Sequence, residues 1–369
     1  MKKRIMIILG KEQFGYHTDT FNYCLYLREK YEITVICRDY KLKKIHLNNI
    51  KVKYITNFQG RLTNGILRVL LSIYYIILIN PELIFISEFI GCSIIKRILK
   101  RKKFVLDIRT SRISYDNDIR EKDNRRIKKE ASYFNNITII SEGVRRLIGI
   151  PENKAFILPL GSKTIVDLES IKLPQSSNKL SLIYVGTFYD RHMEDTIIAF
   201  NRFSEKCDGK NLTYTLIGFF EDNEKKEYIE YIKNLIASNK YNNIKYIGRV
   251  FNEELAPYFI DSNIGVSYIP ITDYYNYQPA TKTYEYLFNG LFTIATSTEE
   301  NKKVINKNNG ILIKDSIEEF YNALEYLYYN KPNISRMEII NSVKKYDWKN
   351  ICEMLSQYLE KILFNGEEE

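Results

Sequence analysis

Residues 278–290 read Gln-Pro-Ala-Thr-Lys-Thr-Tyr-Glu-Tyr-Leu-Phe-Asn-Gly, and apolar, strand-like runs flank them at 263–269 and 292–296. Pro279 has no backbone N–H and disfavours helix at the residue before it, while Thr281 is a favoured N-cap. Gly290 stands where a helix commonly ends with a residue in the left-handed conformation. The pattern predicts a strand, a loop, a short helix over 281–289 and a second strand.

Two charged side chains stand in the first turn of this predicted helix. A helix N-terminus carries unpaired N–H groups and the positive end of the helix dipole, and α/β proteins bind anions there, at the carboxyl end of a sheet. Lys282 can pair with a phosphate, and Glu285 can accept hydrogen bonds from sugar hydroxyls. The alternative is an ordinary Lys–Glu pair on a capped surface helix.

The run Lys282-Thr283-Tyr284-Glu285-Tyr286-Leu287, followed by Gly290, resembles the nucleotide-sugar signature of glycosyltransferase family 4, the group 1 glycosyltransferases. That signature reads Pro-x-Lys-x-aromatic-Glu-Tyr-x-x-x-Gly. The resemblance implies an α/β protein of GT-B fold. In this fold two Rossmann-like domains face each other across a cleft, and a C-terminal helix crosses back to the first domain.

The resemblance also implies roles within the signature. Glu285 corresponds to the family's second Glu, which usually holds the nucleotide ribose. In this sequence Tyr277 takes the place of the family's first Glu, and Pro279 lies one residue further from the Lys than the pattern has it. The contact to the donor sugar is therefore left open. Two further residues are expected to contact the donor: Thr281 and Tyr284.

Length and charge bound the class of protein. At 369 residues with 45% hydrophobic residues, the chain suits two globular domains. Residues 1–165 hold 32 Lys/Arg and 15 Asp/Glu, a net +17, whereas residues 166–369 hold 23 and 30, a net −7. The basic half suggests nucleic acid, an anionic membrane surface or a phosphorylated substrate, and composition does not choose among them.

Cysteine usage and hydropathy indicate a cytoplasmic protein. The five cysteines are scattered and form no Cys-x-x-Cys, so a disulfide framework or a thiolate metal site is not expected. The apolar run after Met1-Lys2-Lys3-Arg4 is too short for a signal peptide and is interpreted as a first strand. The longest apolar segment, 66–79, falls short of the roughly 20 residues that a spanning helix needs.

Apolar β-branched runs alternate with amphipathic segments along the whole chain, which is typical of parallel sheets covered by helices. Strands are expected at 4–9, 33–37, 52–55, 83–87, 104–108, 137–141 and 156–158, and again at 180–185, 213–217, 244–247, 264–269, 292–295 and 311–313. Helices are expected near 18–30, 65–79, 92–100, 118–134 and 142–148, and again near 194–205, 224–238, 253–260, 281–289, 299–306 and 316–330.

Two domains follow from this alternation. An N-terminal Rossmann-like acceptor domain is expected over 1–165, and a C-terminal Rossmann-like nucleotide-sugar domain over 178–346. The polar segment 160–178, with Gly161, Pro174 and Ser176-Ser177, is interpreted as the linker. Residues 347–365 have helical apolar spacing and are assigned to the first domain on the resemblance.

Other positions resemble the donor-binding segments of the family. Residues 182–191 resemble the strand and loop where a basic pair meets the donor diphosphate; Thr187 replaces one basic partner after Gly186, and Arg191 remains as the other. A surface Arg on a turn is the alternative. The run Ile247-Gly248-Arg249-Val250 resembles the loop whose backbone contacts the nucleobase, which makes Val250 a donor contact.

Candidate acceptor residues lie in the first half. Gly15 falls in the loop after the first strand and is expected to line the donor phosphates, although neither Gly-x-Gly-x-x-Gly nor a P-loop pattern is present. His17 and Asp19 are candidates for acceptor hydroxyls, with a helix-cap interaction as the alternative for Asp19. Asp107 and Arg109 resemble the family's strand-end Asp-x-Arg, with a structural ion pair as the alternative.

One acidic motif is interpreted as structural. Asp116-Asn117-Asp118 spells the Asp-x-Asp that another transferase fold uses with a metal ion. It leads directly into a charged helical segment, so it is expected to cap that helix. No metal site and no cofactor are predicted, and the nucleoside diphosphate sugar is the donor substrate.

The sequence thus predicts a retaining, metal-independent hexosyltransferase that moves a sugar to an acceptor hydroxyl, with Arg191, Lys282 and Glu285 as its catalytic residues. Positive charge at the donor site would stabilise the departing diphosphate. By analogy with the family, the leaving phosphate itself accepts the acceptor's proton. Two rivals stay open: a GT-B nucleotide-sugar epimerase, and a nucleic-acid-binding protein built on the basic half.

A basic cluster suggests where the acceptor resides. Six cations within eight residues favour docking on an anionic membrane surface, where a lipid-linked saccharide for cell-surface polysaccharide synthesis would be presented. The protein would then be cytoplasmic and peripheral on the inner face of the membrane. The alternative is a solvated basic helix end. The six residues are Lys96, Arg97, Lys100, Arg101, Lys102 and Lys103.

Overall fold

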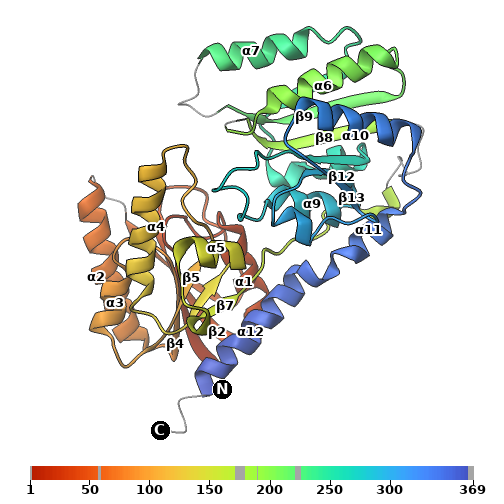
Figure 1. Ribbon diagram of the computed structural model, residues 1–369. Helices are drawn as coiled ribbons and strands as arrows, with labels where there is room; N and C mark the ends of the chain where they lie inside the picture. Colours follow the sequence, from red (N-terminus) through yellow and green to blue (C-terminus); the bar gives the residue numbers. More distant parts are fainter. Residues whose placement is uncertain (1, 57–59, 171–178, 189, 221–225, 365–369) are drawn as a thin grey trace. The chain divides into compact units, whose positions relative to one another are not determined.

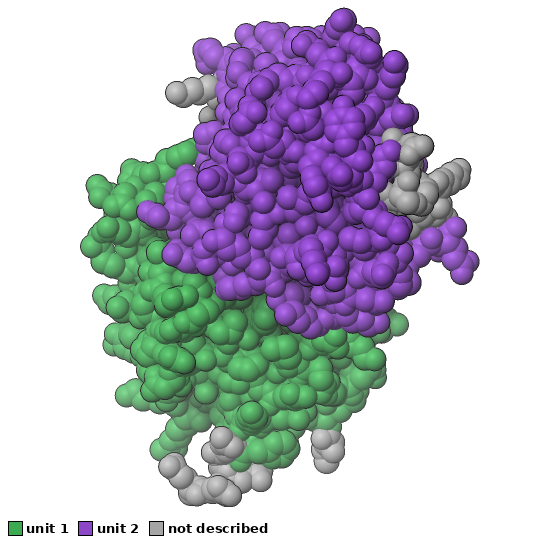
Figure 2. Space-filling view, turned by 45° about the vertical axis from the view of Figure 1, so that its right-hand side comes forward, with its two compact units in different colours: residues 1–161, 348–369 green, residues 162–347 purple. Residues whose placement is uncertain are grey.

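The computed structural model describes residues 2–56, 60–170, 179–188, 190–220 and 226–364. The chain forms two compact units, which are coloured separately in Figure 2. Unit 1 comprises Met1–Gly161 and Trp348–Glu369, and unit 2 comprises Ser162–Asp347. Much of the expected linker, 171–178, and the last five residues, 365–369, lie outside the described residues.

Unit 1 is built on a parallel sheet with seven strands among the described residues (Figure 1). Its strands in sheet order are β3 (Ile50–Thr56), β2 (Tyr31–Asp39), β1 (Lys3–Ile8), β4 (Leu83–Ser87), β5 (Lys103–Ile108), β6 (Ile137–Ile139) and β7 (Ala155–Ile157). Its helices are α1 (Thr18–Leu27), α2 (Arg61–Ile79), α3 (Cys92–Ile98), α4 (Asn117–Ala131), α5 (Glu142–Ile148) and α12 (Trp348–Phe364). Buried β-branched residues in β1, β2 and β4 explain why helices cover both faces.

Unit 2 repeats the architecture with six parallel strands in the described part of the chain. They are, in sheet order, β10 (Ile244–Gly248), β9 (Leu212–Phe219), β8 (Leu180–Thr187), β11 (Ile264–Ser267), β12 (Phe292–Thr296) and β13 (Gly310–Ile313). Its helices are α6 (Met193–Lys206), α7 (Lys226–Ala237), α8 (Ala256–Ile260), α9 (Thr281–Phe288), α10 (Ile317–Tyr329) and α11 (Arg336–Ser342). The predicted α/β fold with two Rossmann-like sheets is confirmed.

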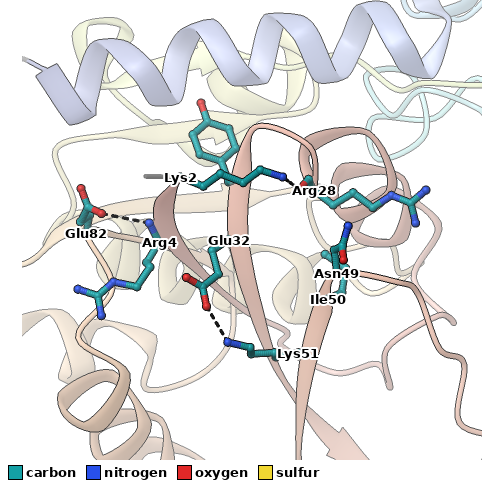
Figure 3. Close-up of a pocket in the computed structure, with 9 residues that line it drawn as sticks. Lys2, Arg4, Arg28, Glu32, Asn49, Ile50, Lys51 and Glu82 are labelled. Atoms are coloured by element: carbon teal, nitrogen blue, oxygen red, sulfur yellow. Dashed lines mark hydrogen bonds and ion pairs between the residues drawn. The ribbon is translucent and has the colours of Figure 1, made fainter.

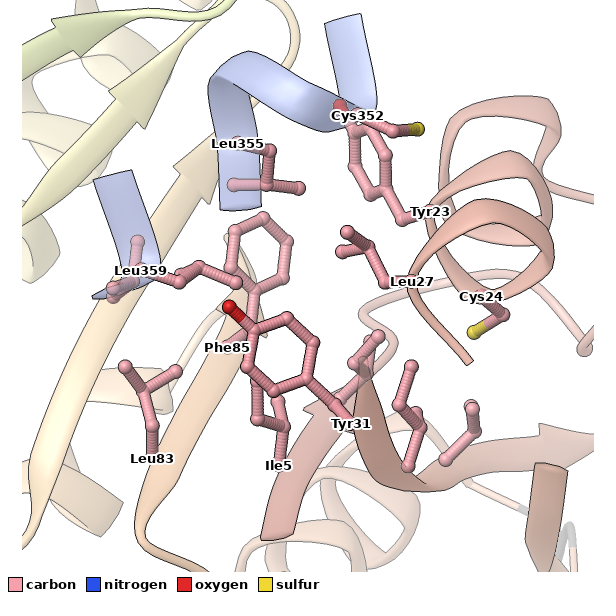
Figure 4. Close-up of a cluster of buried hydrophobic side chains, with 14 of the residues drawn as sticks. Ile5, Tyr23, Cys24, Leu27, Tyr31, Leu83, Phe85, Cys352, Leu355 and Leu359 are labelled. Carbon is pink, nitrogen blue, oxygen red and sulfur yellow. The ribbon is translucent and has the colours of Figure 1, made fainter. Parts of the chain in front are cut away.

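The last helix belongs to unit 1, as the resemblance implies. Figure 4 shows Leu355 and Leu359 of α12 pointing into a cluster that also contains Tyr23 of α1 and Phe85 of β4. Trp348 opens the helix and packs edge-on against the Tyr23 ring, with 6.0 Å between ring centroids. A side chain at Gly161 would overlap the Trp348 ring, so the chain leaves unit 1 directly beneath this Trp. The return of α12 therefore completes the core of unit 1.

One element prediction was wrong, and one element was missed. The helix expected at 299–306 is only the 3₁₀ turn Asn301–Lys303, in which the buried Asn301 side chain bonds to Thr283 of α9 and Thr296 of β12. Helix α11 was not predicted, although Ser335 and Glu338 form a capping box at its start. The expected capping role of the acidic motif is confirmed, since Asp116 accepts a hydrogen bond from the Ile119 N–H.

Candidate functional site

The carboxyl end of the sheet in unit 2 contains a topological switch point. Strands β8 and β11 are neighbours, but the chain continues from β8 toward β9 and from β11 toward β12, in opposite directions along the sheet. Ligands of open α/β sheets bind in the crevice at such a point. Two segments start at this edge: the loop that follows β8 and contains Arg191, and helix α9, which follows β11 in the chain. The fold thus places Arg191, Lys282 and Glu285 at one edge of one sheet.

Tyr286 fixes helix α9 where these strands separate. The pairing of β8 with β11 extends only to Ile183 and Gly265 in the described strands, so the next N–H groups of β8 need other acceptors. The Val185 N–H donates to the Tyr286 hydroxyl at 2.8 Å. The Tyr286 ring is fully buried, and a side chain at Gly265 would overlap it. Helix α9 is therefore pinned to both strands at the switch point.

A buried polar network holds the other side of α9. Thr283 bonds through its hydroxyl to Ser267 at the end of β11, at 2.6 Å, and to Asn301 at 2.9 Å. Asn301 donates in turn to the Thr296 carbonyl at the end of β12, at 2.8 Å. All these groups are buried, so breaking one bond would leave an unsatisfied polar atom in the core. The network fixes the orientation of the helix's first turn.

The C-terminus of α9 is held by a buried cation. Gly290 has φ +70°, as the sequence predicts, and lies against the Arg336 side chain. The Arg336 guanidinium donates to the carbonyls of Asn289 and Phe259 at 3.2 and 3.1 Å, and also to the Ser262 carbonyl. Burial lowers the pKa of Arg336 to about 10, so it stays charged at neutral pH. A cation at this end complements the helix dipole.

At its N-terminus, α9 lacks a side-chain cap. Ala280 takes the N-cap position and makes no side-chain hydrogen bond, so the prediction that Thr281 caps the helix was wrong. Thr281 is instead the first helical residue, and its side chain is exposed. Lys282 Nζ lies 2.5 Å from Glu285 Oε2, with both side chains about one-quarter exposed. The helix thus presents an uncapped first turn and a cation–carboxylate pair to the crevice.

Arg191 lies beside the segment that leads into α9. Its guanidinium carbon sits 4.4 Å from the centroid of the buried Tyr275 ring, a cation–π contact. One terminal nitrogen, Nη1, is buried and has no hydrogen-bond partner among the residues that the structure describes. Burial raises the pKa of the Tyr275 hydroxyl, which therefore stays neutral beside the cation. A buried donor without a partner is rare in proteins, and an anionic ligand bound at this nitrogen would accept its hydrogen bond.

The remaining donor candidates lie around the same edge. Gly218 of β9 lets the Gly186 carbonyl approach closely, because a side chain at Gly218 would overlap that carbonyl. Thr187 offers its carbonyl to the Tyr184 hydroxyl at 2.6 Å. Val250 packs, partly buried, on the cluster that contains Tyr286. The Tyr284 ring is buried and meets the Tyr346 ring edge-on, with 5.1 Å between centroids. The donor roles of these residues stay predictions.

In unit 1 two of the four acceptor candidates, Asp19 and Arg109, form an ion pair with each other. Arg109 Nε donates to Asp19 Oδ2 at 2.6 Å, so the structural ion pair is real but joins Arg109 to Asp19, whereas Asp107 was considered as its partner. The expected alternative of a helix cap at Asp19 was wrong, because His17 occupies the N-cap of α1 and accepts from the Thr20 N–H. The pair is almost fully buried, which ties the end of β5 to α1.

Asp107 is the least satisfied of these residues. Its Oδ1 accepts from the Thr138 hydroxyl at 2.7 Å, while Oδ2 is buried and has no hydrogen-bond partner within the described ranges. Burial raises the pKa of Asp107, and the nearby Arg109 opposes that shift. Gly15 has φ +94°, and a side chain there would overlap Ile45. Packing alone accounts for this glycine, and its contact with donor phosphates stays a prediction.

A wide pocket of about 920 Å³ opens elsewhere on unit 1 (Figure 3). It lies at the amino ends of β1, β2 and β3, the edge opposite to the loops that hold the acceptor candidates. Its charged groups largely pair with each other, as Lys51 Nζ does with Glu32 Oε1 at 2.6 Å. None of the candidate residues lines it. The pocket residues are Lys2, Arg4, Arg28, Tyr31, Glu32, Asn49, Ile50, Lys51 and Glu82.

Further properties of the described residues bear on the sequence predictions. No helix among them is long and apolar enough to cross a membrane. Nor do the described side chains include a group of three or more His, Cys, Asp or Glu placed to hold a metal ion. All five cysteines lie in the described part of the chain, and no disulfide joins them.

Sequence reasoning missed several residues that build the site. Tyr286 was noted only as part of the motif, while Tyr275, Asn301 and Arg336 were not singled out. Tyr286 and Arg336 bond to residues 101 and 47 to 77 positions away, and Asn301 bonds to a helix residue 18 positions away, so spacing along the chain gives no signal for them. The cluster Tyr274-Tyr275 just before the Pro279 loop was the one available hint, since aromatic residues in a loop often have a packing role.

Comparison with known proteins agrees with this geometry. Residues 179–330 match the family described as Glycosyl transferases group 1. None of the curated proteins matches the sequence. The fold is similar to that of sucrose-phosphate synthase from Thermosynechococcus elongatus, with 15% identity, a TM-score of 0.74, and 99% of this chain and 100% of that chain covered.

Two further solved structures have the same fold. Anabaena HepE in complex with UDP is 13% identical with a TM-score of 0.73, covering 97% of this chain and 100% of its own. The α,α-trehalose 6-phosphate synthase of Burkholderia multivorans is 9% identical with a TM-score of 0.74, covering 100% and 98%. At these identities the likeness shows the fold, which is the expected GT-B fold.

Proposed function

We propose that the protein is a retaining glycosyltransferase, because residues 179–330 match the group 1 glycosyltransferase family and the chain has the GT-B fold. It moves a hexose-type sugar from a nucleoside diphosphate sugar to an acceptor hydroxyl. The donor is a substrate, and neither a cofactor nor a metal ion takes part. The acceptor is a saccharide, and the nucleotide sugar is held by unit 2.

One observation supports this proposal: Arg191 has a buried guanidinium nitrogen without a partner in the described part of the chain, at the switch point where the uncapped α9 begins. A diphosphate placed there would accept from Arg191 and from the first N–H groups of α9. Lys282 would add a second positive charge. These groups are held in place before reaction, so they can stabilise the charge that develops on the departing diphosphate.

Glu285 has a different role in this account. Its carboxylate is acceptor-only, and it faces the same crevice one turn from the helix N-terminus. Ribose hydroxyls would donate to it, and its present partner Lys282 would turn toward phosphate. In this account the Lys282–Glu285 pair separates when the nucleotide binds, and Lys282 then contacts phosphate while Glu285 contacts ribose. The leaving phosphate would take the acceptor's proton, so no separate base is required.

We further propose a cytoplasmic enzyme that takes a lipid-linked saccharide at the inner face of a membrane, in the synthesis of a cell-surface polysaccharide. The support is the net +17 of residues 1–165. The basic cluster contributes less than its sequence suggests, because three of its six cations bond to nearby backbone carbonyls. These are Lys96 to Lys100 and Lys102, Lys102 to Pro81, and Lys103 to Leu363.

The test is release of nucleoside diphosphate from a panel of nucleotide sugars, each with and without saccharide acceptors. Uridine nucleotides come first, since the structurally similar Anabaena protein is in complex with UDP. The proposal expects release that depends on acceptor and a product whose anomeric configuration matches the donor. Sugar isomerisation without acceptor would instead indicate an epimerase, and an inverted product would contradict retention.

A further inference from the structure

Helix α2 of unit 1 is apolar on both faces. One face is buried, with Arg68, Val69, Ser72 and Ile76 packed inside the unit. The opposite face carries a row of apolar side chains at helical spacing, each between 53% and 64% exposed: Ile66, Leu70, Tyr74, Ile77 and Leu78. A surface helix is normally polar on the side away from the core, so this row calls for a partner.

The neighbouring helix extends this apolar surface. Helix α3 packs against α2, and Gly91 at its start lies against Val69. Both helices lie on the same side of the unit 1 sheet in Figure 1. Three more isoleucines are exposed here, with Ile90 the most exposed at 67%. We call the eight side chains together the α2–α3 ridge: Ile66, Leu70, Tyr74, Ile77, Leu78, Ile90, Ile94 and Ile98.

The exposed charges at the end of α3 are cationic. No acidic residue occurs between Arg61 and Ile79. Two carboxylates near α3 already have partners within unit 1. Glu130 accepts from the Gly91 and Ser93 N–H groups at 2.8 and 2.9 Å, and Glu88 pairs with Arg126 at 2.6 Å. The exposed cations at the end of α3 are Arg97, Lys100 and Arg101. The ridge is therefore apolar with a cationic border.

We infer that the α2–α3 ridge enters the acyl boundary of an anionic membrane leaflet, with α2 lying in the plane of the interface. An apolar face with basic residues at its edge is the pattern of helices that bind membranes in this way. Tyr74 suits the interface, where amphipathic rings concentrate. The inference rests on one part of the proposed function, the lipid-linked saccharide acceptor. By docking on the membrane, the ridge would bring this acceptor to unit 1.

A second copy of the chain fits the ridge less well. A two-fold interface places the same patch against itself, so the cations Arg97, Lys100 and Arg101 of both copies would be gathered in one interface. Like charges brought together without a counter-charge oppose association. An anionic leaflet meets both properties of the surface at once: its acyl chains accept the ridge, and its headgroups accept the cationic border.

The experiment is sedimentation of the full chain with vesicles of phosphatidylcholine alone, or of phosphatidylcholine and phosphatidylglycerol in equal parts. The ridge variant carries Leu70→Gln, Ile77→Gln and Ile98→Gln. The matched control carries Tyr326→Gln, Tyr329→Gln and Met337→Gln, which replace exposed apolar residues of unit 2. The border variant carries Arg97→Gln, Lys100→Gln and Arg101→Gln.

Wild type and control are expected to bind the mixed vesicles at about 0.1 M salt and to retain part of that binding at about 1 M, where charges are screened within about 3 Å. The ridge variant should bind on the order of a hundredfold more weakly at both salts, because three apolar side chains no longer enter the membrane. The border variant should lose the preference for anionic vesicles. Wild-type binding that disappears entirely at high salt, or a ridge variant that binds like the control, would overturn the inference.

A fluorescence readout makes the test independent of folding losses. Tyr74→Trp introduces an indole on the ridge, while the native Trp348 is 2% exposed and gives a constant background. Mixed vesicles should shift the new emission to the blue and allow quenching by brominated lipid. No shift, or a wild-type dimer that the ridge variant converts to monomer, would contradict the membrane and favour a second copy. Nucleotide binding by the ridge variant should match wild type. A loss of membrane binding can therefore be distinguished from a failure of the proposed function.

Discussion

The two sheets end in edges of similar topology that use their polar residues differently. At the carboxyl edge of unit 1, Asp19 and Arg109 form a buried ion pair, and His17 caps its own helix. At the carboxyl edge of unit 2, Arg191 has a buried nitrogen without a partner among the described side chains and backbone, and Lys282 and Glu285 form a partly exposed pair. Residue types alone would not distinguish these edges.

We infer from this difference that unused hydrogen-bonding capacity, rather than charge, distinguishes the candidate binding site. A buried ion pair that is complete in itself stabilises the structure only in that form, and breaking it is costly. A cation stacked on an aromatic ring with a spare donor still has bonding capacity. Changes at the first edge should thus affect stability, while changes at the second should affect ligand binding and turnover.

The largest expected effect is on the stability of unit 1. Arg109→Met should lower the free energy of unfolding by about 3–5 kcal/mol, because it leaves the Asp19 carboxylate buried and uncompensated. The measurement is urea unfolding followed by circular dichroism. The double variant Asp19→Leu, Arg109→Met is the control and should recover much of the loss. If the single variant is as stable as wild type while transfer to acceptor is abolished, Arg109 has a binding role instead.

Glu285→Gln should reduce turnover about a hundredfold or more with little change in unfolding, since a carboxylate that accepts ribose hydroxyls is worth about 3 kcal/mol. The matched control is Glu299→Gln, because Glu299 and Lys302 form the same i,i+3 pair at 2.7 Å on an exposed turn of unit 2. Near-normal turnover in the Glu285 variant would remove it from the site and leave only an ordinary surface pair.

Arg191→Ala and Lys282→Ala should each weaken nucleoside diphosphate binding about tenfold or more while changing nucleoside binding little. Each removes a charge-assisted hydrogen bond worth roughly 1.5–3 kcal/mol. Calorimetry with both ligands measures the difference, and Lys302→Ala serves as the control cation. Equal losses for nucleoside and nucleoside diphosphate would show that neither residue senses phosphate.

The smallest effect concerns His192, the neighbour of Arg191. A hydrogen bond to Glu194, 3.5 Å away, raises the pKa of His192 above its ordinary value. Its contribution to stability is therefore complete below pH about 6.5 and fades as pH rises through the folded-state pKa. Solvent screens this half-exposed imidazole, so the contribution should stay below about 1 kcal/mol.

His192→Asn should flatten the pH dependence of thermal unfolding in this window without changing it below. Asn tolerates the left-handed backbone that His192 adopts at φ +48°, so the substitution leaves the start of α6 intact. A steeper dependence in the variant would contradict the assignment of the pair to His192 and Glu194.

The sequence was informative wherever local chemistry decides the structure. Pro279 and Gly290 bracketed α9, the alternation of apolar runs indicated two parallel sheets, and Asp116 was recognised as a cap. Choices between partners were not predictable in the same way. Asp107 and Asp19 are both carboxylates near Arg109, and only the folded positions of β5 and α1 decide which one pairs with it. The Tyr286 contact with Val185 likewise depends on where two strands separate.

The central claim is that the switch point of unit 2 holds a nucleoside diphosphate through Arg191 and α9. The most direct measurement is thermal unfolding of wild type and Arg191→Ala over a panel of nucleoside diphosphates. A cognate ligand at about 100 times its dissociation constant should stabilise wild type by about 2.7 kcal/mol, and the variant by clearly less at the same concentration. The claim is contradicted if no nucleoside diphosphate stabilises wild type, or if the variant is stabilised equally.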